Sequence, residues 1–414
     1  MIRQNRVVVT GMGILAPNGI GIDAFWGSLI AGRSGIGPIT LFDASDFKSR
    51  IAGEVKNFNP LDYIEPEFKP KRMARHTQFA YAAAMMALKD AGLDLKNLDL
   101  PSPTPVMIGV STSAIDVIES VYLAVRENGP NRVPTTSSAA SIPQAAANTI
   151  ADRIGFSAHA TTVSSACPSG LDALADASAL IRSGAAEVAI AGGADAPITA
   201  LTMASFIASG LSSVRNSEPE KASRPFDLER DSGVISEGGG VFVLENLERA
   251  QARGARIYLE IGGYGKQRDR DQALPGSGLE DSMNLALANA NCTPVDVDYI
   301  SAYGPSHPVL DAVEIEAIRK VFGQSAYSIP VSSIKGVTGN PLAAGGPFQV
   351  AACALTFRDQ LIPPTANYEI ADPNCDLDFV PNRARKAKVD CALVNVRGIG
   401  GSASSLVVNR VAHK

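Results

Sequence analysis

Residues 163–170, Val-Ser-Ser-Ala-Cys-Pro-Ser-Gly, determine how the fold of this chain is interpreted, because they join a predicted strand to a predicted helix through a cysteine. Ala160 to Ser165 is rich in Thr, Val and Ser and predicts a strand. Gly170 to Ser183 has apolar residues at helical spacing, and Gly184 supplies a stop. The start of a helix offers free N–H groups and the positive end of the helix dipole, and both favour a thiolate. We therefore predict that Cys167 is a nucleophile, with a buried structural cysteine as the alternative.

Strand and helix patterns alternate on both sides of this corner. The predicted strands are Arg6–Gly13, Pro105–Val110, Glu187–Ala191, Val241–Leu244, Ile257–Ile261, Tyr299–Tyr303, Ile329–Ser333 and Ala392–Val396. The predicted helices are Phe25–Gly32, Thr77–Ala91, Ala114–Glu127, Pro143–Arg153, Asn246–Arg253, Asp311–Phe322 and Phe348–Arg358. The triplet Val163-Ser164-Ser165 returns as Val331-Ser332-Ser333 before a later helix. This alternation in two similar parts predicts α/β layers with an internal duplication.

Composition excludes several classes of protein. The chain has 414 residues, a net charge of −5 and no long run of Lys or Arg, which argues against a nucleic-acid interface. Its five cysteines are scattered without CxxC spacing, which points to a reducing compartment and away from zinc or disulfides. No stretch approaches the roughly 20 apolar residues of a membrane span. The N-terminal stretch MIRQNRVVVTGMGILAP predicts a strand rather than a signal peptide. We therefore expect a cytoplasmic protein.

Four stretches, in order along the chain, resemble one known family from end to end. They are RVVVTGMGILAPNG at 6–19, VSSACPSGLDAL at 163–174, SRPFDLERDSGVISEGGGVFVLE at 223–245 and VSSIKGVTGNPLAAGG at 331–346. The chain resembles the elongating β-ketoacyl-acyl carrier protein synthases of type II and their polyketide ketosynthase relatives. The resemblance implies a thiolase fold, with two βαβαβαββ halves stacked as α-β-α-β-α layers, divided here at 1–250 and 251–414. It further implies a dimer with no tightly bound cofactor, which receives acyl groups on the phosphopantetheine arm of acyl carrier protein.

The resemblance also implies a catalytic site in which two residues depart from the family. Cys167 stands where the family's cysteine takes the acyl chain, whereas Tyr303 and Asn340 stand where the family has histidines. Tyrosine, with a reference pKa near 10, is a poor base at neutral pH. Asparagine can donate a hydrogen bond to an oxyanion but cannot transfer a proton. Pro305 and His307 replace the two threonines that hold the pantetheine arm, and His307 is a candidate relocated base.

Other family positions are retained. Lys335 and Glu314 occupy the positions of a charge pair beneath the site, with solvated surface charges as the alternative. In the loop Gly398-Ile399-Gly400-Gly401, the N–H of Ile399 would complete an oxyanion hole with the N–H of Cys167, and a simple tight turn is the alternative. The resemblance places the following residues at substrate-binding positions: Ile108, Pro305, His307, Glu314 and Gly400. It places these positive charges where carrier protein docks: Lys69, Lys71, Arg72 and Arg75. A solvated helix end is the alternative for that basic stretch.

Two functional hypotheses remain open. In the first, the protein is an acyltransferase of the β-ketoacyl synthase type that forms a thioester on Cys167 and condenses weakly or not at all. In the second, it is a non-catalytic chain-length-factor (KSβ) subunit paired with a catalytic ketosynthase. Val396–Gly401 and Gly345-Gly346-Pro347 resemble chain-length factors, which also lack both histidines. Those proteins usually carry another residue where this chain has Cys167.

Overall fold

The computed structural model describes residues 5–95, 100–155, 158–271 and 275–411. Its main sheet is built from two sets of five strands. The first set is β1 (Val7–Ala16), β5 (Thr104–Gly109), β6 (Ala158–Val163), β7 (Val188–Asp195) and β8 (Gly238–Asn246). The second set is β9 (Leu259–Arg268), β10 (Tyr299–Ser301), β11 (Val331–Ser332), β14 (Cys391–Arg397) and β15 (Ser402–Asn409). The basic N-terminal residues 1–4 lie outside the described residues.

Both sets have the same topology. From its outer edge inward, each half runs in the order third, second, fourth, fifth and first strand. In each half the second strand pairs in parallel with the third and the fourth, and the fifth pairs antiparallel with the fourth and the first. The two halves meet where Val7–Val9 of β1 pairs with Leu259–Ile261 of β9. The internal duplication predicted from the sequence is thus confirmed by strand order, whereas the division into domains 1–250 and 251–414 stays a prediction.

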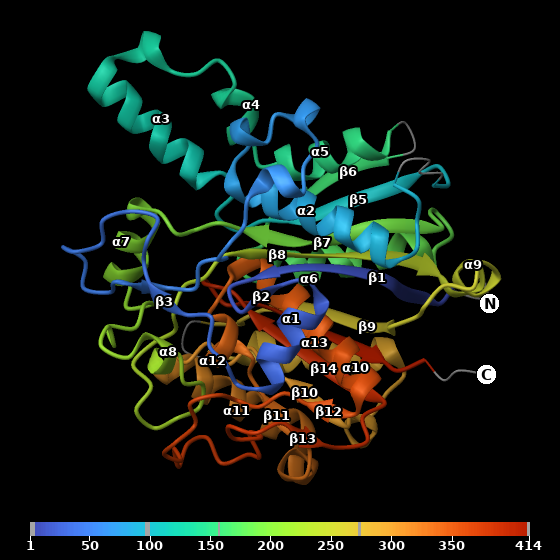
Figure 1. Ribbon diagram of the computed structural model, residues 1–414. Helices are drawn as coiled ribbons and strands as arrows, with labels where there is room; N and C mark the ends of the chain where they lie inside the picture. Colours follow the sequence, from blue (N-terminus) through green and yellow to red (C-terminus); the bar gives the residue numbers. More distant parts are fainter. Residues whose placement is uncertain (1–4, 96–99, 156–157, 272–274, 412–414) are drawn as a thin grey trace.

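Helices fill three layers around the two halves of the sheet (Figure 1). In the central layer, α6 (Ser169–Arg182) packs on β5 and β7, and α13 (Gly345–Asp359) packs on β14 and on α6. The first outer layer holds α2 (Arg75–Asp90) and α5 (Ala145–Ile154), and the second holds α10 (Ser277–Ala290) and α11 (Pro308–Phe322). The layers therefore stack as α-β-α-β-α, as expected from the sequence.

Two glycines bring the central helices close together. A Cβ on Gly170 in α6 would lie 2.2 Å from the Ala343 carbonyl oxygen, and one on Gly346 in α13 would lie 2.8 Å from the Leu171 Cβ. Contacts this short cannot hold a side chain, so glycine at both positions permits the approach. The approach brings the cysteine corner of the first half against residues 340–344 of the second.

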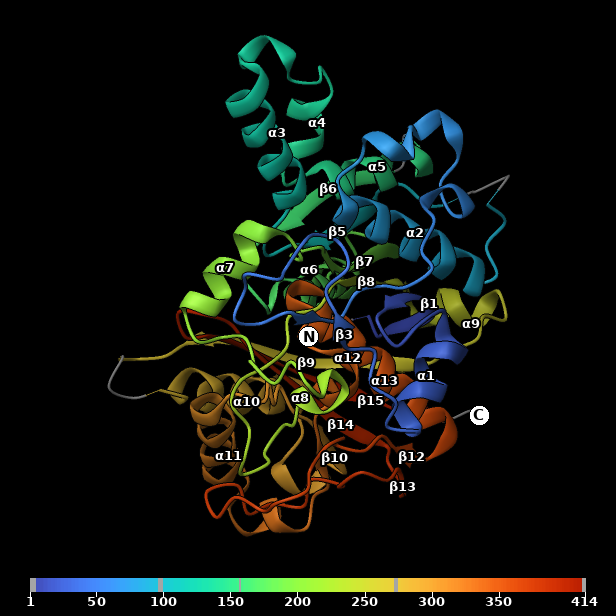
Figure 2. The same ribbon diagram turned by 60° about the vertical axis from the view of Figure 1, so that its left-hand side comes forward.

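Smaller elements surround this body. The helices are α1 (Ile22–Ile30), α3 (Ile115–Asn128), α4 (Ser137–Ser141), α7 (Ala200–Ala208), α8 (Pro219–Ala222), α9 (Leu247–Ala252) and α12 (Lys335–Thr338). The short strands are β2 (Gly19–Ile20), β3 (Gly37–Pro38), β4 (Ile51–Ala52), β12 (Leu361–Ile362) and β13 (Arg385–Lys386). Helices α3 and α4 project from the body (Figure 2). Within the described ranges, no helix has the length and apolar character needed to cross a bilayer.

Candidate active site

The cysteine corner has a fixed backbone conformation. Ala166, directly before Cys167, has a φ of 65° in the left-handed region, which turns the chain sharply between β6 and α6. The Ser169 hydroxyl closes the turn by accepting a hydrogen bond from the Ser165 N–H at 2.8 Å and donating one to the Ala166 carbonyl at 2.5 Å. Cys167 itself is 3% exposed. The predicted strand-to-helix corner is therefore present, with its thiol at the edge of a buried cavity.

The electrostatics of this thiol differ from our expectation. Burial raises the pKa of the Cys167 thiol above its usual value, although a hydrogen bond from Tyr303 and the charge of Lys335 act in the opposite direction. Burial therefore opposes the stabilisation of a thiolate that we expect from the helix start. The role of Cys167 as a nucleophile stays a prediction.

Tyr303 contacts the sulfur, and two buried charges hold its backbone. The Tyr303 hydroxyl donates a hydrogen bond to the Cys167 Sγ at 3.6 Å. Glu314 accepts hydrogen bonds from the N–H groups of Tyr303 and Gly304, at 2.9 and 2.8 Å. Lys335 donates from Nζ to the Tyr303 carbonyl at 2.7 Å, and the same nitrogen lies 4.4 Å from the centre of the tyrosine ring. The backbone of residues 303–304 is thus fixed from both sides.

Burial sets the protonation of these groups. Glu314 is 1% exposed and Lys335 2% exposed, so the alternative of solvated surface charges is wrong. Burial lowers the pKa of Lys335 to about 8 and raises the pKa of Glu314. Burial and the neighbouring Cys167 raise the pKa of Tyr303 well above 10. Tyr303 therefore remains protonated at neutral pH and acts as a hydrogen-bond donor, not as a base.

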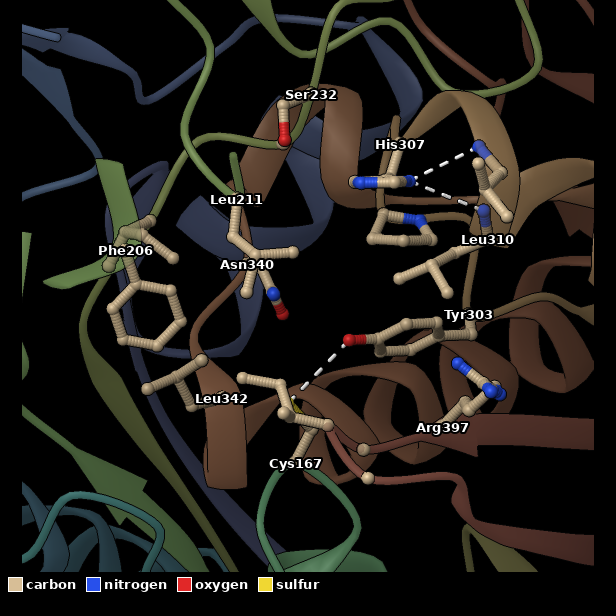
Figure 3. Close-up of a pocket in the computed structure, with 17 residues that line it drawn as sticks. Cys167, Phe206, Leu211, Ser232, Tyr303, His307, Leu310, Asn340, Leu342 and Arg397 are labelled. Carbon is tan, nitrogen blue, oxygen red and sulfur yellow. Dashed lines mark hydrogen bonds between the residues drawn. The ribbon is translucent and has the colours of Figure 1, made fainter. Parts of the chain in front are cut away.

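Asn340 approaches the sulfur from another segment. Its N–H donates to the Val234 carbonyl at 2.7 Å and its carbonyl accepts from the Ser236 N–H at 3.0 Å, so a strand-like bridge fixes its backbone. Its side chain points toward Cys167 and Tyr303 (Figure 3). A hydrogen bond from Asn340 opposes the rise in the Tyr303 pKa, while the Asn340 Oδ1 is buried without a donor. Asn340 therefore presents an amide to the sulfur and to the tyrosine hydroxyl.

The glycine-rich loop between β14 and β15 packs on the cysteine corner. A Cβ on Gly398 would lie 2.6 Å from the Ser402 Oγ, 3.0 Å from the Pro168 Cδ and 3.2 Å from the Ala166 Cβ. Among the described residues, the Ile399 N–H donates to no backbone carbonyl, and the Cys167 N–H acts on its own sulfur. An oxyanion hole requires two N–H groups that converge beside the nucleophile, and that role for these two groups stays a prediction. Ile399 is 60% exposed, so it leaves the cavity open at this side.

These segments enclose a cavity of about 320 Å³ above the Cys167 sulfur (Figure 3). Predicted site residues that line it are Cys167, Tyr303, Pro305, His307, Asn340, Ile399 and Gly400. The remaining lining residues were not predicted, and they are Phe206, Leu211, Ser232, Gly233, Ile235, Val309, Leu310, Leu342, Arg397 and Gly398. Most of these are apolar and come from distant parts of the chain. Sequence periodicity does not place them at one site.

His307 is a helix cap, which contradicts the hypothesis that it is a relocated base. Its Nδ1 accepts hydrogen bonds from the N–H groups of Val309 and Leu310, at 3.1 and 3.4 Å, at the start of α11. Burial and Arg230 lower the pKa of His307, so the ring is neutral and carries its hydrogen on Nε2. A nitrogen that carries hydrogen can donate but cannot accept a proton. His307 therefore offers a hydrogen-bond donor.

Two other expectations are also wrong in part. Ile108 is fully buried in the core of the first half and does not line the cavity. Arg75 pairs with the buried Glu237 through hydrogen bonds of 2.7 and 2.6 Å, so it is not free to dock a partner. The buried carboxylate holds the guanidinium against the body. The remaining basic residues of that stretch, Lys69, Lys71 and Arg72, are exposed.

Comparison with known proteins identifies the family. The chain matches the β-ketoacyl synthase N-terminal domain over residues 4–250 and the β-ketoacyl synthase C-terminal domain over residues 258–369. This chain belongs to the β-ketoacyl synthase family. The tetracenomycin polyketide synthase ketoacyl synthase alpha subunit of Streptomyces glaucescens is 40% identical, and the alignment covers 98% of this chain and 97% of that one.

Solved structures confirm the fold of this β-ketoacyl synthase. The ishigamide ketosynthase/chain length factor superposes with a TM-score of 0.92 at 32% identity, covering 99% of this chain and 100% of that one. A ketosynthase bound to a hexaketide, solved with its type II polyketide acyl carrier protein, superposes with a TM-score of 0.90 at 35% identity and the same coverage. The predicted family and thiolase fold are therefore both confirmed.

Proposed function

We propose that this β-ketoacyl synthase transfers an acyl group from the phosphopantetheine arm of acyl carrier protein to Cys167 and performs decarboxylative condensation only very slowly. The observation that carries the proposal is the hydrogen bond from Tyr303 to the Cys167 sulfur, in place of a family histidine. A phenol with a raised pKa can stabilise a thiolate but cannot remove a proton at neutral pH. The site therefore keeps its nucleophile and lacks its bases.

The transfer is an exchange of thiols. The Cys167 sulfur attacks the thioester carbonyl, whose oxygen gains negative charge that the N–H groups of Cys167 and Ile399 stabilise. The bond from the carbonyl carbon to the pantetheine sulfur then breaks, and the proton from Cys167 ends on that departing sulfur. During attack, Tyr303 and Asn340 donate hydrogen bonds on the thiolate side of the cavity. No cofactor enters this exchange.

Condensation would need a further step that the site does not support. Loss of carbon dioxide from a malonyl thioester leaves an enolate, which the family's histidines stabilise. Each missing acid–base group typically costs about 10² to 10⁴ in rate. Tyr303 and Asn340 occupy both of those positions, and His307 has its Nδ1 occupied by backbone N–H groups.

Partners follow from relatives and from the surface. A related ketosynthase was solved with its acyl carrier protein, which supports docking here at Lys69, Lys71 and Arg72. Another related structure is a ketosynthase/chain length factor, which supports a homodimer or a heterodimer with a ketosynthase. We place the reaction in the cytoplasm, in fatty acid or polyketide assembly.

Intact-protein mass spectrometry after incubation with acyl carrier proteins bearing different acyl chains tests the transfer. We expect the mass of one acyl group on the wild-type protein and none on Cys167→Ala. Release of carbon dioxide from malonyl-acyl carrier protein should barely exceed that in a sample without the protein. An unmodified wild-type protein would refute the acyltransferase and favour the non-catalytic KSβ subunit. Turnover like that of an ordinary ketosynthase would show that another group replaces the histidines.

The chain-length-factor alternative has its own supporting observation. The relatives include a ketosynthase/chain length factor at a TM-score of 0.92, and this chain lacks both histidines. Such a subunit should bind a histidine-containing ketosynthase tightly and change the length of its products. Co-purification with the ketosynthase of the same organism, with unchanged products when Cys167 is replaced by Ala, would support it.

A further inference from the structure

Arg397 is a cation in the cavity wall that the proposed reaction does not use. It ends β14, directly before the glycine-rich loop, and its side chain lies beneath the Tyr303 ring (Figure 3). We propose that Arg397 forms a carboxylate subsite, so that the acyl group carried by Cys167 is a dicarboxylic half-thioester whose distal carboxylate is retained. This inference rests on the proposed acyl transfer and names its substrate class.

The hydrogen bonding of Arg397 leaves donors free. Its side chain is 10% exposed, and Nη2 donates to the Asp269 carboxylate at 2.5 Å. The buried Nε has no acceptor, and Nη1 makes no hydrogen bond to any described residue. A buried guanidinium N–H without an acceptor costs free energy. Arg397 is thus only partly satisfied by the protein.

Asp269 holds Arg397 in place, and both oxygens of its carboxylate accept hydrogen bonds. One of its oxygens accepts hydrogen bonds from the N–H groups of Gly276 and Gly278, at 3.0 and 2.9 Å, and the other takes Arg397. The Asp269 N–H donates to the Gly401 carbonyl at 2.9 Å. The arginine is therefore held between α10 and the glycine-rich loop, in the wall of the cavity that Cys167 also lines.

The position of Arg397 indicates which part of a substrate it would meet. Its positive charge acts on the Tyr303 hydroxyl, the group that contacts the nucleophilic sulfur. The remaining wall is largely apolar, with Phe206, Leu211 and Leu342 opposite. An acyl chain would be covered by this apolar wall, and a carboxylate at its end would meet the guanidinium. Arginine donates to carboxylates through charge-assisted hydrogen bonds, which are about twice as strong as neutral ones.

The covalent step stays balanced with this substrate. The Cys167 sulfur bonds to the thioester carbonyl carbon, pantetheine leaves as its thiol with the cysteine proton, and the distal carboxylate is unchanged. Retention of that carboxylate agrees with the absence of histidines at 303 and 340. The product on Cys167 is an acyl thioester that still carries a negative charge.

The test compares two isosteric acyl chains on pantetheine. Succinyl-pantetheine ends in a carboxylate, and 4-methylpentanoyl-pantetheine has the same heavy-atom skeleton with methyl groups in place of the oxygens. The acylation rates at Cys167 are measured by intact-protein mass spectrometry. Their ratio separates the effect of the terminal carboxylate from the ability of an acyl chain of this size to enter the cavity. We expect succinyl to load at least about tenfold faster on wild type. In Arg397→Gln combined with Asp269→Asn, which avoids an unpaired carboxylate, this preference should disappear. In Asp269→Asn alone, with Arg397 intact, it should persist.

A second measurement separates this inference from the proposed function. Cys167→Ala cannot be acylated, so calorimetry reports only binding of the same two compounds, with free succinate and inorganic phosphate as competitors. We expect Arg397-dependent binding of succinyl-pantetheine, with succinate competing and phosphate not. Equal loading of both chains on wild type would overturn the subsite and leave the acyltransferase standing. Binding that depends on Arg397, without acylation of wild type, would support the subsite and overturn the acyltransferase. Competition by phosphate as strong as that by succinate would reduce the site to a general anion site and refute the dicarboxylic substrate.

Discussion

Replacing Tyr303 by Phe removes the hydroxyl that donates to the Cys167 sulfur at 3.6 Å and leaves the ring in place. A hydrogen bond to a charged acceptor contributes about 1.5 kcal/mol, so loss of this one should raise the Cys167 pKa by about one unit. A less stabilised thiolate is also a stronger nucleophile, and its rate constant rises by about 0.4 to 0.5 log units for each unit of pKa. This rise offsets part of the loss in thiolate concentration. The net effect below the thiol pKa is a rate about threefold to fourfold lower.

The pH profile distinguishes this role from others. Acylation of wild type should rise with pH beyond pH 9, because burial holds the pKa of Cys167 above its usual value. In Tyr303→Phe the whole profile should move to higher pH, and its plateau should be about threefold higher than in wild type because the thiolate is more reactive. The rates come from intact-protein mass spectrometry with a pantetheine thioester at a series of pH values.

Tyr299→Phe is the matched control. Tyr299 is also fully buried, on β10, and its hydroxyl pairs with the Ser332 hydroxyl at 2.7 Å, away from the cavity. Its pH profile should coincide with that of wild type. Coincident profiles for Tyr303→Phe and wild type would refute the contact with the sulfur. A rate reduced about a hundredfold at every pH would instead show that Tyr303 moves a proton.

Three further changes test the bases, the loop and a buried carboxyl. Tyr303→His combined with Asn340→His should yield β-ketoacyl product from malonyl-acyl carrier protein. The double variant should make more product than either single variant, because residues that act as one unit are non-additive. A double variant that is rapidly acylated yet makes no product would contradict this prediction. Gly398→Ala should slow acylation about tenfold or more, because its Cβ would lie 2.6 Å from the Ser402 Oγ and would displace the loop. Gly27→Ala is the control, since its Cβ would meet nothing within 4 Å, and its acylation rate should match wild type. Equal acylation rates in the two variants would show that the loop has no part in transfer. Burial raises the pKa of Asp195 to about 6, so the folded state holds this proton more tightly than the unfolded state. Stability in urea should therefore fall as pH rises from about 4 to 6, and Asp195→Asn should flatten that fall; an unchanged slope would refute the shift.

Local sequence signals predicted the framework of the fold and the strand-to-helix corner that carries Cys167. Ten of ten residues in β1 are buried, as its continuous apolar run indicates, and the corner at Cys167 follows from the strand and helix patterns beside it. Elements with weak patterns were missed. β15 begins with the small residues Ser-Ala-Ser-Ser before its apolar half, and α10 mixes Ser, Asn and Ala with few large side chains. In both, tertiary contacts supply the order that propensity does not.

The electrostatics of the site could not be predicted from the sequence. The pKa of Cys167 depends on how much water the fold removes, and that quantity has no signal in residues 163–170. Arg397 and Asp269 meet although 128 positions separate them in the chain. Arg75 looked like part of a basic surface because its partner Glu237 is remote in sequence. In each case the sequence gives the residue type, but it does not show which distant side chain that residue contacts in the fold.

The grip of Glu314 and Lys335 on the peptide at 303–304 has an evolutionary consequence. Both charges bind main-chain atoms, which every residue type possesses. The backbone at position 303 is therefore held in the same way whichever side chain it carries. A histidine codon becomes a tyrosine or an asparagine codon through a single base change. A lineage could therefore lose both histidines in two single-base changes while keeping a folded protein that retains Cys167. Because the side chain at position 303 can change while its backbone contacts persist, this position is a natural starting point for redesigning the reaction.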